Sequence, residues 1–112
     1  MFLLNELPLC PIETAAKIVG SKWRLMILRE LMSQTKRYSE IQRGIPEISQ
    51  KVLTENLKSM EKDGIIIRTA YAEVPPRVEY SLSDLGKDII PVMKALAGWG
   101  IKYQESVKAA NL

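Results

Sequence analysis

The fold is decided by residues 48–64, which are ISQKVLTENLKSMEKDG. Ser49 is suited to cap a helix that begins after it, and Ile48 can form a hydrophobic staple with an apolar residue one turn later. The apolar residues of this helix fall on one face at helical spacing: Leu53, Leu57 and Met60. The pair Asp63-Gly64 then gives a helix stop. The stretch predicts an amphipathic helix with one buried and one solvent-facing side.

Two β-rich segments follow this helix, at residues 65–71 and 77–82. In the second segment, Val78, Tyr80 and Leu82 alternate with polar residues, a pattern typical of a strand with one buried face. The connecting residues 72–76 end in two prolines, which cannot donate hydrogen bonds to a sheet. We therefore predict a two-stranded hairpin with a stiff tip.

Shorter helices are predicted before this unit. The first covers residues 10–19, with a proline at its start and a glycine at its end. The second runs from a Ser21 cap to Met32. Residues 39–42, Ser-Glu-Ile-Gln, match a capping box, so a third helix is expected to start at Ser39 and to end before Ile45-Pro46.

A longer helical segment is predicted at the C-terminal end, after a cap at Ser83. Its apolar residues have the 4-3-4-3-4 spacing of an a/d seam: Leu85, Ile89, Val92, Leu96, Trp99 and Tyr103. Pro91 removes one helical hydrogen bond, so we expect a kink or break within residues 87–91. The earlier helices already fill the core of a domain of this length, which leaves the seam for a second copy of the chain.

The order of these elements is typical of a winged helix-turn-helix. We predict a mainly α fold with a small β-hairpin (α+β), organised as one domain over residues 1–112 with dimerisation segments at both ends. The third and fourth helices, joined by residues 44–48, form the pair that would lie on DNA.

The composition excludes most enzyme classes. The chain has 112 residues with no His and one Cys, so it lacks the commonest general base, the commonest metal ligand and any set of thiolates for zinc. Its apolar runs are shorter than the roughly 20 residues that cross a bilayer, and the first ten residues do not resemble a secretory signal. We expect a cytoplasmic binding protein without catalytic activity, metal or cofactor.

The basic residues favour the middle of the chain. The net charge is +3, and residues 21–80 hold eleven basic and eight acidic side chains. Gln50 and Lys51 lie in the first turn of the fourth helix, where Gln can pair with adenine and Lys with guanine. Polar residues at these positions also suit a plain solvated face, and it is the hairpin following the helix that favours DNA contact.

The predicted DNA contacts lie on three segments. The rigid tip would present Arg77 to a minor groove or to phosphate. The full set is Ser49, Gln50, Lys51, Thr54, Glu55 and Lys58 on the fourth helix, Arg77 at the hairpin, and Lys36 and Arg37 before the third helix.

Two further sets of residues are singled out. The predicted dimer interface consists of Leu3, Leu7, Leu96, Trp99 and Tyr103. Cys10 precedes a helix, whose positive end favours a reactive thiolate and hence a redox sensor. The alternative for Cys10 is the ordinary one, a small apolar residue that packs against a neighbour.

Several motifs of the chain resemble the HxlR family of bacterial transcriptional regulators. They are Cys10-Pro11-Ile12-Glu13, Gly20-Ser21-Lys22-Trp23-Arg24, Lys36-Arg37-Tyr38-Ser39-Glu40-Ile41, Ile45-Pro46-Glu47-Ile48-Ser49-Gln50-Lys51 and Val74-Pro75-Pro76-Arg77-Val78-Glu79-Tyr80. The resemblance covers about residues 10–100. It implies a MarR-like winged helix that dimerises through its terminal helices and binds double-stranded DNA at a pseudo-palindromic operator.

The resemblance also bears on Cys10, which matches the cysteine through which some family members sense electrophiles or oxidants. The chain has no second Cys, so only a Cys10–Cys10 bridge between copies, a mixed disulfide or S-alkylation remains. Two other functions stay open. One is a regulator that binds a small molecule in a pocket under the dimer helices near Trp23 and Trp99, and the other is a winged helix used for protein–protein assembly.

Overall fold

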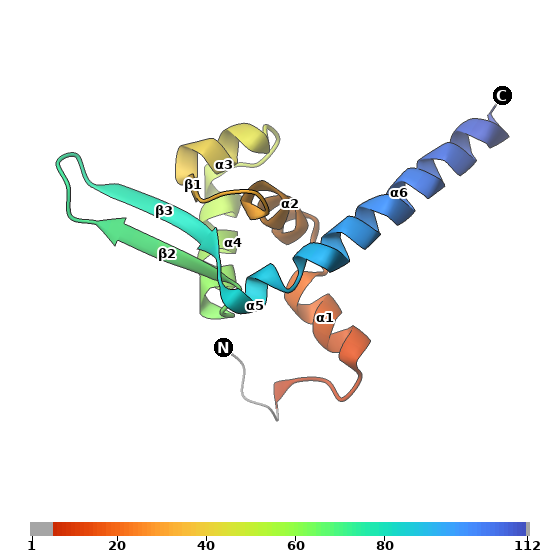
Figure 1. Cartoon of the computed structure of the whole chain (residues 1–112), viewed down its shortest axis with the longest axis horizontal. Helices are drawn as coiled ribbons and strands as arrows, with labels where there is room; N and C mark the ends of the chain where they lie inside the picture. Colours follow the sequence, from red (N-terminus) through yellow and green to blue (C-terminus); the bar gives the residue numbers. More distant parts are fainter. Residues whose placement is uncertain (1–5, 112) are drawn as a thin grey trace.

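The computed structural model describes residues 6–111. Its elements follow in the order α1 (Pro11–Val19), α2 (Lys22–Leu31), β1 (Lys36–Arg37), α3 (Tyr38–Gly44), α4 (Gln50–Lys62), β2 (Ile66–Tyr71), β3 (Arg77–Leu82), α5 (Asp84–Lys87) and α6 (Ile90–Ala110). The β2–β3 hairpin extends from one side of the helical body and α6 projects from the other (Figure 1). The mainly α fold with a small β-hairpin is confirmed.

The core lies between α2, α3, α4 and the base of the hairpin. The predicted inward face of α4 is buried there, through Leu53, Leu57 and Met60. The other buried apolar side chains are Ile27, Leu28, Leu31, Ile41, Ile45, Ile48, Ile65, Ile66 and Leu82. Within the described part of the chain, α1 and α6 contribute no fully buried side chain, but Ile18 and Val19 of α1 and Ile90 and Met93 of α6 pack against the edge of this core.

Serine caps fix the starts of three helices, as the sequence predicts. Each hydroxyl oxygen accepts a backbone N–H from the first turn: Ser21 from Arg24 at 3.1 Å, Ser49 from Val52 at 3.2 Å and Ser83 from Gly86 at 3.0 Å. The end of α4 is fixed by Gly64, whose φ of 81° lies in the left-handed region that glycine adopts without strain.

The predicted capping box at Ser39 is wrong. The helix begins at Tyr38, Arg37 occupies the cap position, and the Glu40 carboxylate accepts the Arg37 backbone N–H at 2.9 Å. The start is displaced because Lys36 and Arg37 pair with β3 as an additional strand, β1. A two-residue strand shows no alternation of polar and apolar residues, so the sequence did not reveal it.

The sheet has the strand order β1-β3-β2, and all its pairs are antiparallel. In the hairpin, Ile66 pairs with Leu82 near the core and Tyr71 pairs with Arg77 next to the tip. Because β3 has a neighbour on each side, Glu79 is partly covered as well. The alternation of buried and exposed residues expected for this strand is therefore absent: residues 77–81 are all half-buried and Leu82 is buried.

The C-terminal segment breaks within the predicted interval, since α5 ends at Lys87 and α6 begins at Ile90. Pro91 lies in the first turn of α6, where its missing N–H leaves no helical bond unmade. Gly86 is buried, and a Cβ at this position would collide with the carbonyl oxygen of Ile65. The backbone of α5 is therefore packed directly on the start of β2. Among the described residues, no helix has the length and apolar character of a membrane span.

Candidate DNA-binding surface and dimerisation face

The outward face of α4 carries the polar residues that the sequence predicts. Ser49, Gln50 and Lys51 are exposed at its start, with Lys51 roughly opposite the buried Leu53 and Gln50 on the flank of the helix. Glu55 and Lys58 continue this exposed face along the helix. The first turn therefore presents an amide and an ammonium group to solvent from a helix that is anchored by its other side.

Tyr38 holds α3 to the beginning of α4. Its hydroxyl donates to the backbone carbonyl of Gln50 at 3.0 Å and lies 3.1 Å from the Thr54 hydroxyl. Thr54 is consequently half-buried and engaged within the protein, which leaves it less able to contact DNA than the sequence suggests. Tyr38 was not predicted as a site residue, because its partners lie 12 and 16 positions away along the chain.

Lys36 forms a largely buried ion pair and does not project freely into solvent. Its ammonium group lies 3.0 Å from a carboxylate oxygen of Glu30, whose other oxygen is 3.1 Å from the Arg29 guanidinium. Burial by itself raises the pKa of Glu30, but the hydrogen bonds and positive charges of Lys36 and Arg29 outweigh it, and the pKa lies below its ordinary value. Arg37, the next residue, is exposed.

The Arg77 guanidinium is also engaged, contrary to the expectation that the tip presents it freely. It lies 3.2 Å from a Glu73 oxygen and 3.5 Å from a Glu79 oxygen, and it stacks on the Tyr71 ring at 4.1 Å. The side chain is only 29% exposed. Arg77 therefore braces the two strands next to the tip, while Val74 on the tip is fully exposed.

Arg24 links α1, α2 and α4. Its guanidinium donates to the Ile18 carbonyl at 2.6 Å, forms an ion pair with Asp63 at 2.8 Å and hydrogen-bonds the Ser59 hydroxyl. These partners lie at the end of α1 and in the last turn and cap of α4. Arg24 thus fixes α1 against α4, a role that the sequence pattern did not reveal because Ser59 and Asp63 lie more than thirty positions away along the chain.

The apolar seam of α6 is exposed in the single chain. Leu96, Trp99 and Tyr103 are 48%, 64% and 60% exposed. Val92 and Val107 lie on the same helical face, and the rings of Trp99 and Tyr103 are 5.5 Å apart. We call these five residues the α6 face. An exposed apolar face of this kind is a candidate interaction surface.

The structure describes only some of the N-terminal residues predicted for the dimer interface and the redox site. Leu7 is half-buried, whereas Leu3 lies outside the described residues. Cys10 is exposed at the cap position of α1, and its side chain makes no capping hydrogen bond. In the single chain the thiol is therefore accessible to reagents and does not pack in the core.

Together, the helix pair α3–α4 and the adjoining hairpin define a winged helix-turn-helix protein. The sequence model of the HxlR-like helix-turn-helix family matches residues 18–108 of the chain. The chain therefore belongs to the HxlR-like helix-turn-helix family of transcriptional regulators.

Similar proteins agree with this assignment. The chain is 46% identical over 95 residues to an uncharacterised HTH-type transcriptional regulator of Methanothermobacter thermautotrophicus, covering 85% of this chain and 72% of that protein. The crystal structure of the HTH-type regulator YtcD is 38% identical with a TM-score of 0.82, covering 87% of this chain and 99% of that one. The redox regulator HypR in its oxidised form is 36% identical with a TM-score of 0.79, covering 83% and 96%.

The ion pair of Glu30 makes the stability of the protein depend on pH. Because the folded state lowers the pKa of Glu30, the stabilisation is fully present above the ordinary glutamate pKa and is lost as pH falls through the lowered value. Glu30→Gln should lower the free energy of unfolding by about 1–3 kcal/mol at pH 7. The difference from wild type should vanish under acidic conditions. Urea titrations at several pH values measure it, with Glu47→Gln on an exposed loop as control.

Proposed function

We propose that the protein is a sequence-specific DNA-binding transcriptional regulator that acts as a homodimer on a pseudo-palindromic operator, without catalytic activity, in the cytoplasm. The observation that carries the proposal is the first turn of α4, where Gln50 and Lys51 are exposed on a helix that is locked in place by Tyr38 and by its own buried face. An α-helix fits the major groove, and its N-terminal residues are the ones that reach base edges.

The exposed residues of α4 have complementary tasks in this proposal. Gln50 and Lys51 would contact adenine and guanine edges, and Glu55 could accept from a cytosine amino group. Lys58, farther along the helix, and the Ser49 hydroxyl would contact phosphate. Thr54 would contact DNA only if its hydroxyl bound the DNA while keeping its hydrogen bond with Tyr38.

The flanking cations contribute unequally. Arg37 is exposed and suited to phosphate. Lys36 and Arg77 already face carboxylates, so a DNA phosphate would have to compete with Glu30, Glu73 or Glu79 for them. The proposal therefore rests on α4 first and on the hairpin second.

The exposed apolar α6 face supports the proposed dimer. Two copies that bury Leu96, Trp99 and Tyr103 against each other would remove these large apolar side chains from water. A two-fold dimer places two recognition helices about 34 Å apart, which matches successive major grooves on one side of the duplex. Leu7 and Leu3 are proposed to extend the interface.

In this proposal, Cys10 makes the regulator responsive to oxidants or electrophiles. Its exposed thiol at the start of α1 supports this role, as does the similarity to the redox regulator HypR. Since the chain has one Cys, a disulfide would join Cys10 to the Cys10 of another copy or to a small thiol. Either product adds a covalent tie or bulk beside α1, which Arg24 connects to α4.

A protein–protein assembly module is the alternative of a different class. The two functions differ in their response to salt, because DNA binding through several Lys and Arg residues releases counterions and weakens steeply as salt rises. Apolar assembly through the α6 face would not weaken in this way. Selection of bound fragments from a random DNA pool, followed by titration of the selected duplex at several salt concentrations, decides between them.

Lys51→Ala should weaken binding to the selected duplex by about tenfold, because a good side-chain contact to a base is worth about 1–3 kcal/mol. Folding should be unaffected, since Lys51 is exposed. Lys108→Ala, at the far end of α6, is the matched control and should bind like wild type (Figure 1). Fluorescence anisotropy measures both, and equal affinity of the two variants would contradict the assignment of α4.

Leu96→Glu or Trp99→Glu should convert the dimer into monomers, because an unpaired charge in an apolar interface costs several kcal/mol. Lys94→Glu, on the opposite face of α6, should leave the dimer intact. Sedimentation velocity distinguishes the two states, and circular dichroism confirms that the variants remain folded. A stable dimer of both Glu variants would show that the subunits meet elsewhere.

Cys10→Ser should bind DNA like the wild-type protein and should not respond to diamide. Treated wild-type protein should lose affinity and should carry a disulfide, seen by mass spectrometry as a linked dimer or as an adduct with added glutathione. Restoration by dithiothreitol is the control for reversibility. An unmodified wild-type thiol, or modification with unchanged DNA binding, would remove Cys10 as a sensor.

A further inference from the structure

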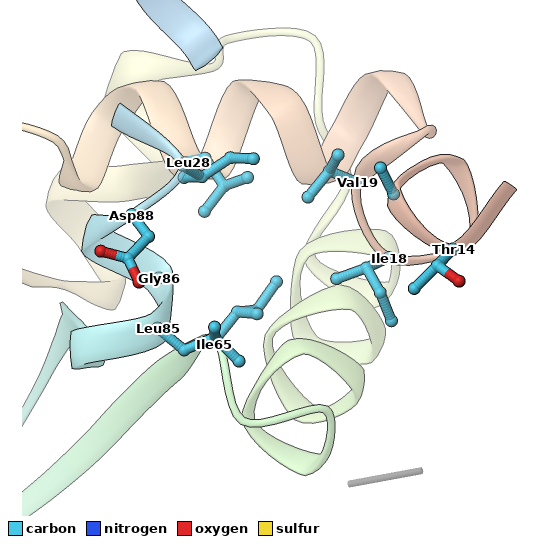
Figure 2. A pocket seen from close by; sticks show the side chains of 10 residues that line it. Thr14, Ile18, Val19, Leu28, Ile65, Leu85, Gly86 and Asp88 are labelled. Carbon is cyan, nitrogen blue, oxygen red and sulfur yellow. The ribbon is translucent and has the colours of Figure 1, made fainter. Parts of the chain in front are cut away.

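An apolar pocket lies between α1, α2, α5 and the residue before β2. Its volume is about 300 Å³, and it is lined by Thr14, Ala15, Ile18, Val19, Leu28, Ile65, Leu85, Gly86, Asp88 and Ile89. Figure 2 shows the aliphatic side chains of Ile18, Val19, Leu28, Ile65 and Leu85 arranged around one common space. Neither Trp23 nor Trp99 lines it, so it is not the pocket that the sequence led us to expect.

Almost all of the surface that lines the pocket is apolar. The Thr14 hydroxyl donates to the Pro8 carbonyl at 3.2 Å, and in Figure 2 it points away from the cavity. Asp88 is exposed and lies at the opposite edge. Among the described residues, no cationic side chain lines the pocket, so a carboxylate or phosphate would find no counter-charge there. An occupant must therefore be uncharged and mostly apolar.

The size of the pocket limits the occupant further. Ligand pockets in proteins measure about 300–1,000 Å³, and an apolar cavity of about 150 Å³ is sufficient for benzene. We propose that this pocket binds a compact, uncharged aromatic or branched aliphatic molecule of one or two rings. Methyl and methylene groups would surround the molecule, and its removal from water would supply the affinity.

The pocket lies beside the connection between α1 and the recognition helix. Leu28 and Ile65 at its wall belong to the buried core, and Ile65 directly follows the turn that ends α4. Ile18 lines the pocket and also gives its carbonyl to Arg24, which pairs with Asp63 at the end of α4. An occupant that separates α1 from α5 would strain this connection, an effect on DNA binding that rests on the proposed function, whereas binding itself does not.

Ala15 provides the test of occupancy. Ala15→Phe adds a ring at the pocket lining from an exposed helical position, and Ala16→Phe adds the same ring on the same helix away from the lining. Toluene, naphthalene and benzoate serve as probes, titrated into the full-length protein and followed by ¹³C-methyl NMR. Toluene and naphthalene should bind wild type and Ala16→Phe alike and should lose at least tenfold in affinity for Ala15→Phe. Benzoate should not bind.

A second measurement needs no variant. In the wild-type protein, intermolecular NOEs should connect toluene protons to the methyl groups of Ile18 and Leu85. NOEs to other methyl groups only, or equal affinity for both Phe variants, would overturn the proposal.

The competing occupant is a side chain of a second copy. In that case wild type would not bind the probes, and Ala15→Phe would dissociate the dimer in sedimentation while Ala16→Phe would not; this result would also overturn the proposal. Because the probes are titrated without DNA, failure of the pocket and failure of DNA binding are separate results.

Discussion

The packing of one face of α4 is the constraint on which the rest of the structure depends. Leu53, Leu57 and Met60 are held between α2, α3 and the base of the hairpin, so α4 cannot rotate about its axis without exposing them. The same packing turns the polar residues outward as a fixed surface. The Ser49 cap and the left-handed Gly64 set where this surface begins and ends. Recognition by a rigid helix avoids the entropic cost of ordering side chains on a mobile loop.

The Lys and Arg side chains fall into two groups, those that form ion pairs within the fold and those that are exposed on its surface. Arg24, Lys36 and Arg77 have their charges directed at carboxylates that hold elements together. Lys51 and Lys58, on the outward face of α4, are exposed. A net charge of +3 is weak evidence for a polyanionic partner. The positions of the exposed lysines on one anchored helix are the stronger argument, because they concentrate positive charge where the helix would enter a groove.

Helix caps and amphipathic faces could be predicted from the sequence because they depend on neighbouring residues. The contacts that the sequence did not reveal depend on residues that are distant along the chain. A cap such as Ser49 depends on atoms within three residues, so its pattern is complete in the sequence itself. The start of α3 at Tyr38 rather than after Ser39 depends on pairing of residues 36–37 with β3, more than forty positions away. The bracing of Arg77 requires the register of the hairpin, and the bond of Tyr38 with Thr54 requires the docking of two helices. Such contacts exist only after the fold has formed.

The C-terminal helix carries the argument for a partner. α6 spans 21 residues without a buried side chain, although helices in water gain most of their stability from packing an apolar face. Gly98 and Gly100 each weaken its interior by about 1 kcal/mol relative to alanine. In the proposed dimer, the α6 face of another copy would give this helix a second surface of matching apolar character. The backbone of α5 is packed on Ile65 through Gly86, and Ile90 and Met93 hold the first turns of α6 against the core, so α6 leaves the domain from an anchored start. In the proposed dimer, the angle at which two α6 helices cross would therefore set the separation of the two α4 helices. This separation must match the spacing of the two half-sites of an operator.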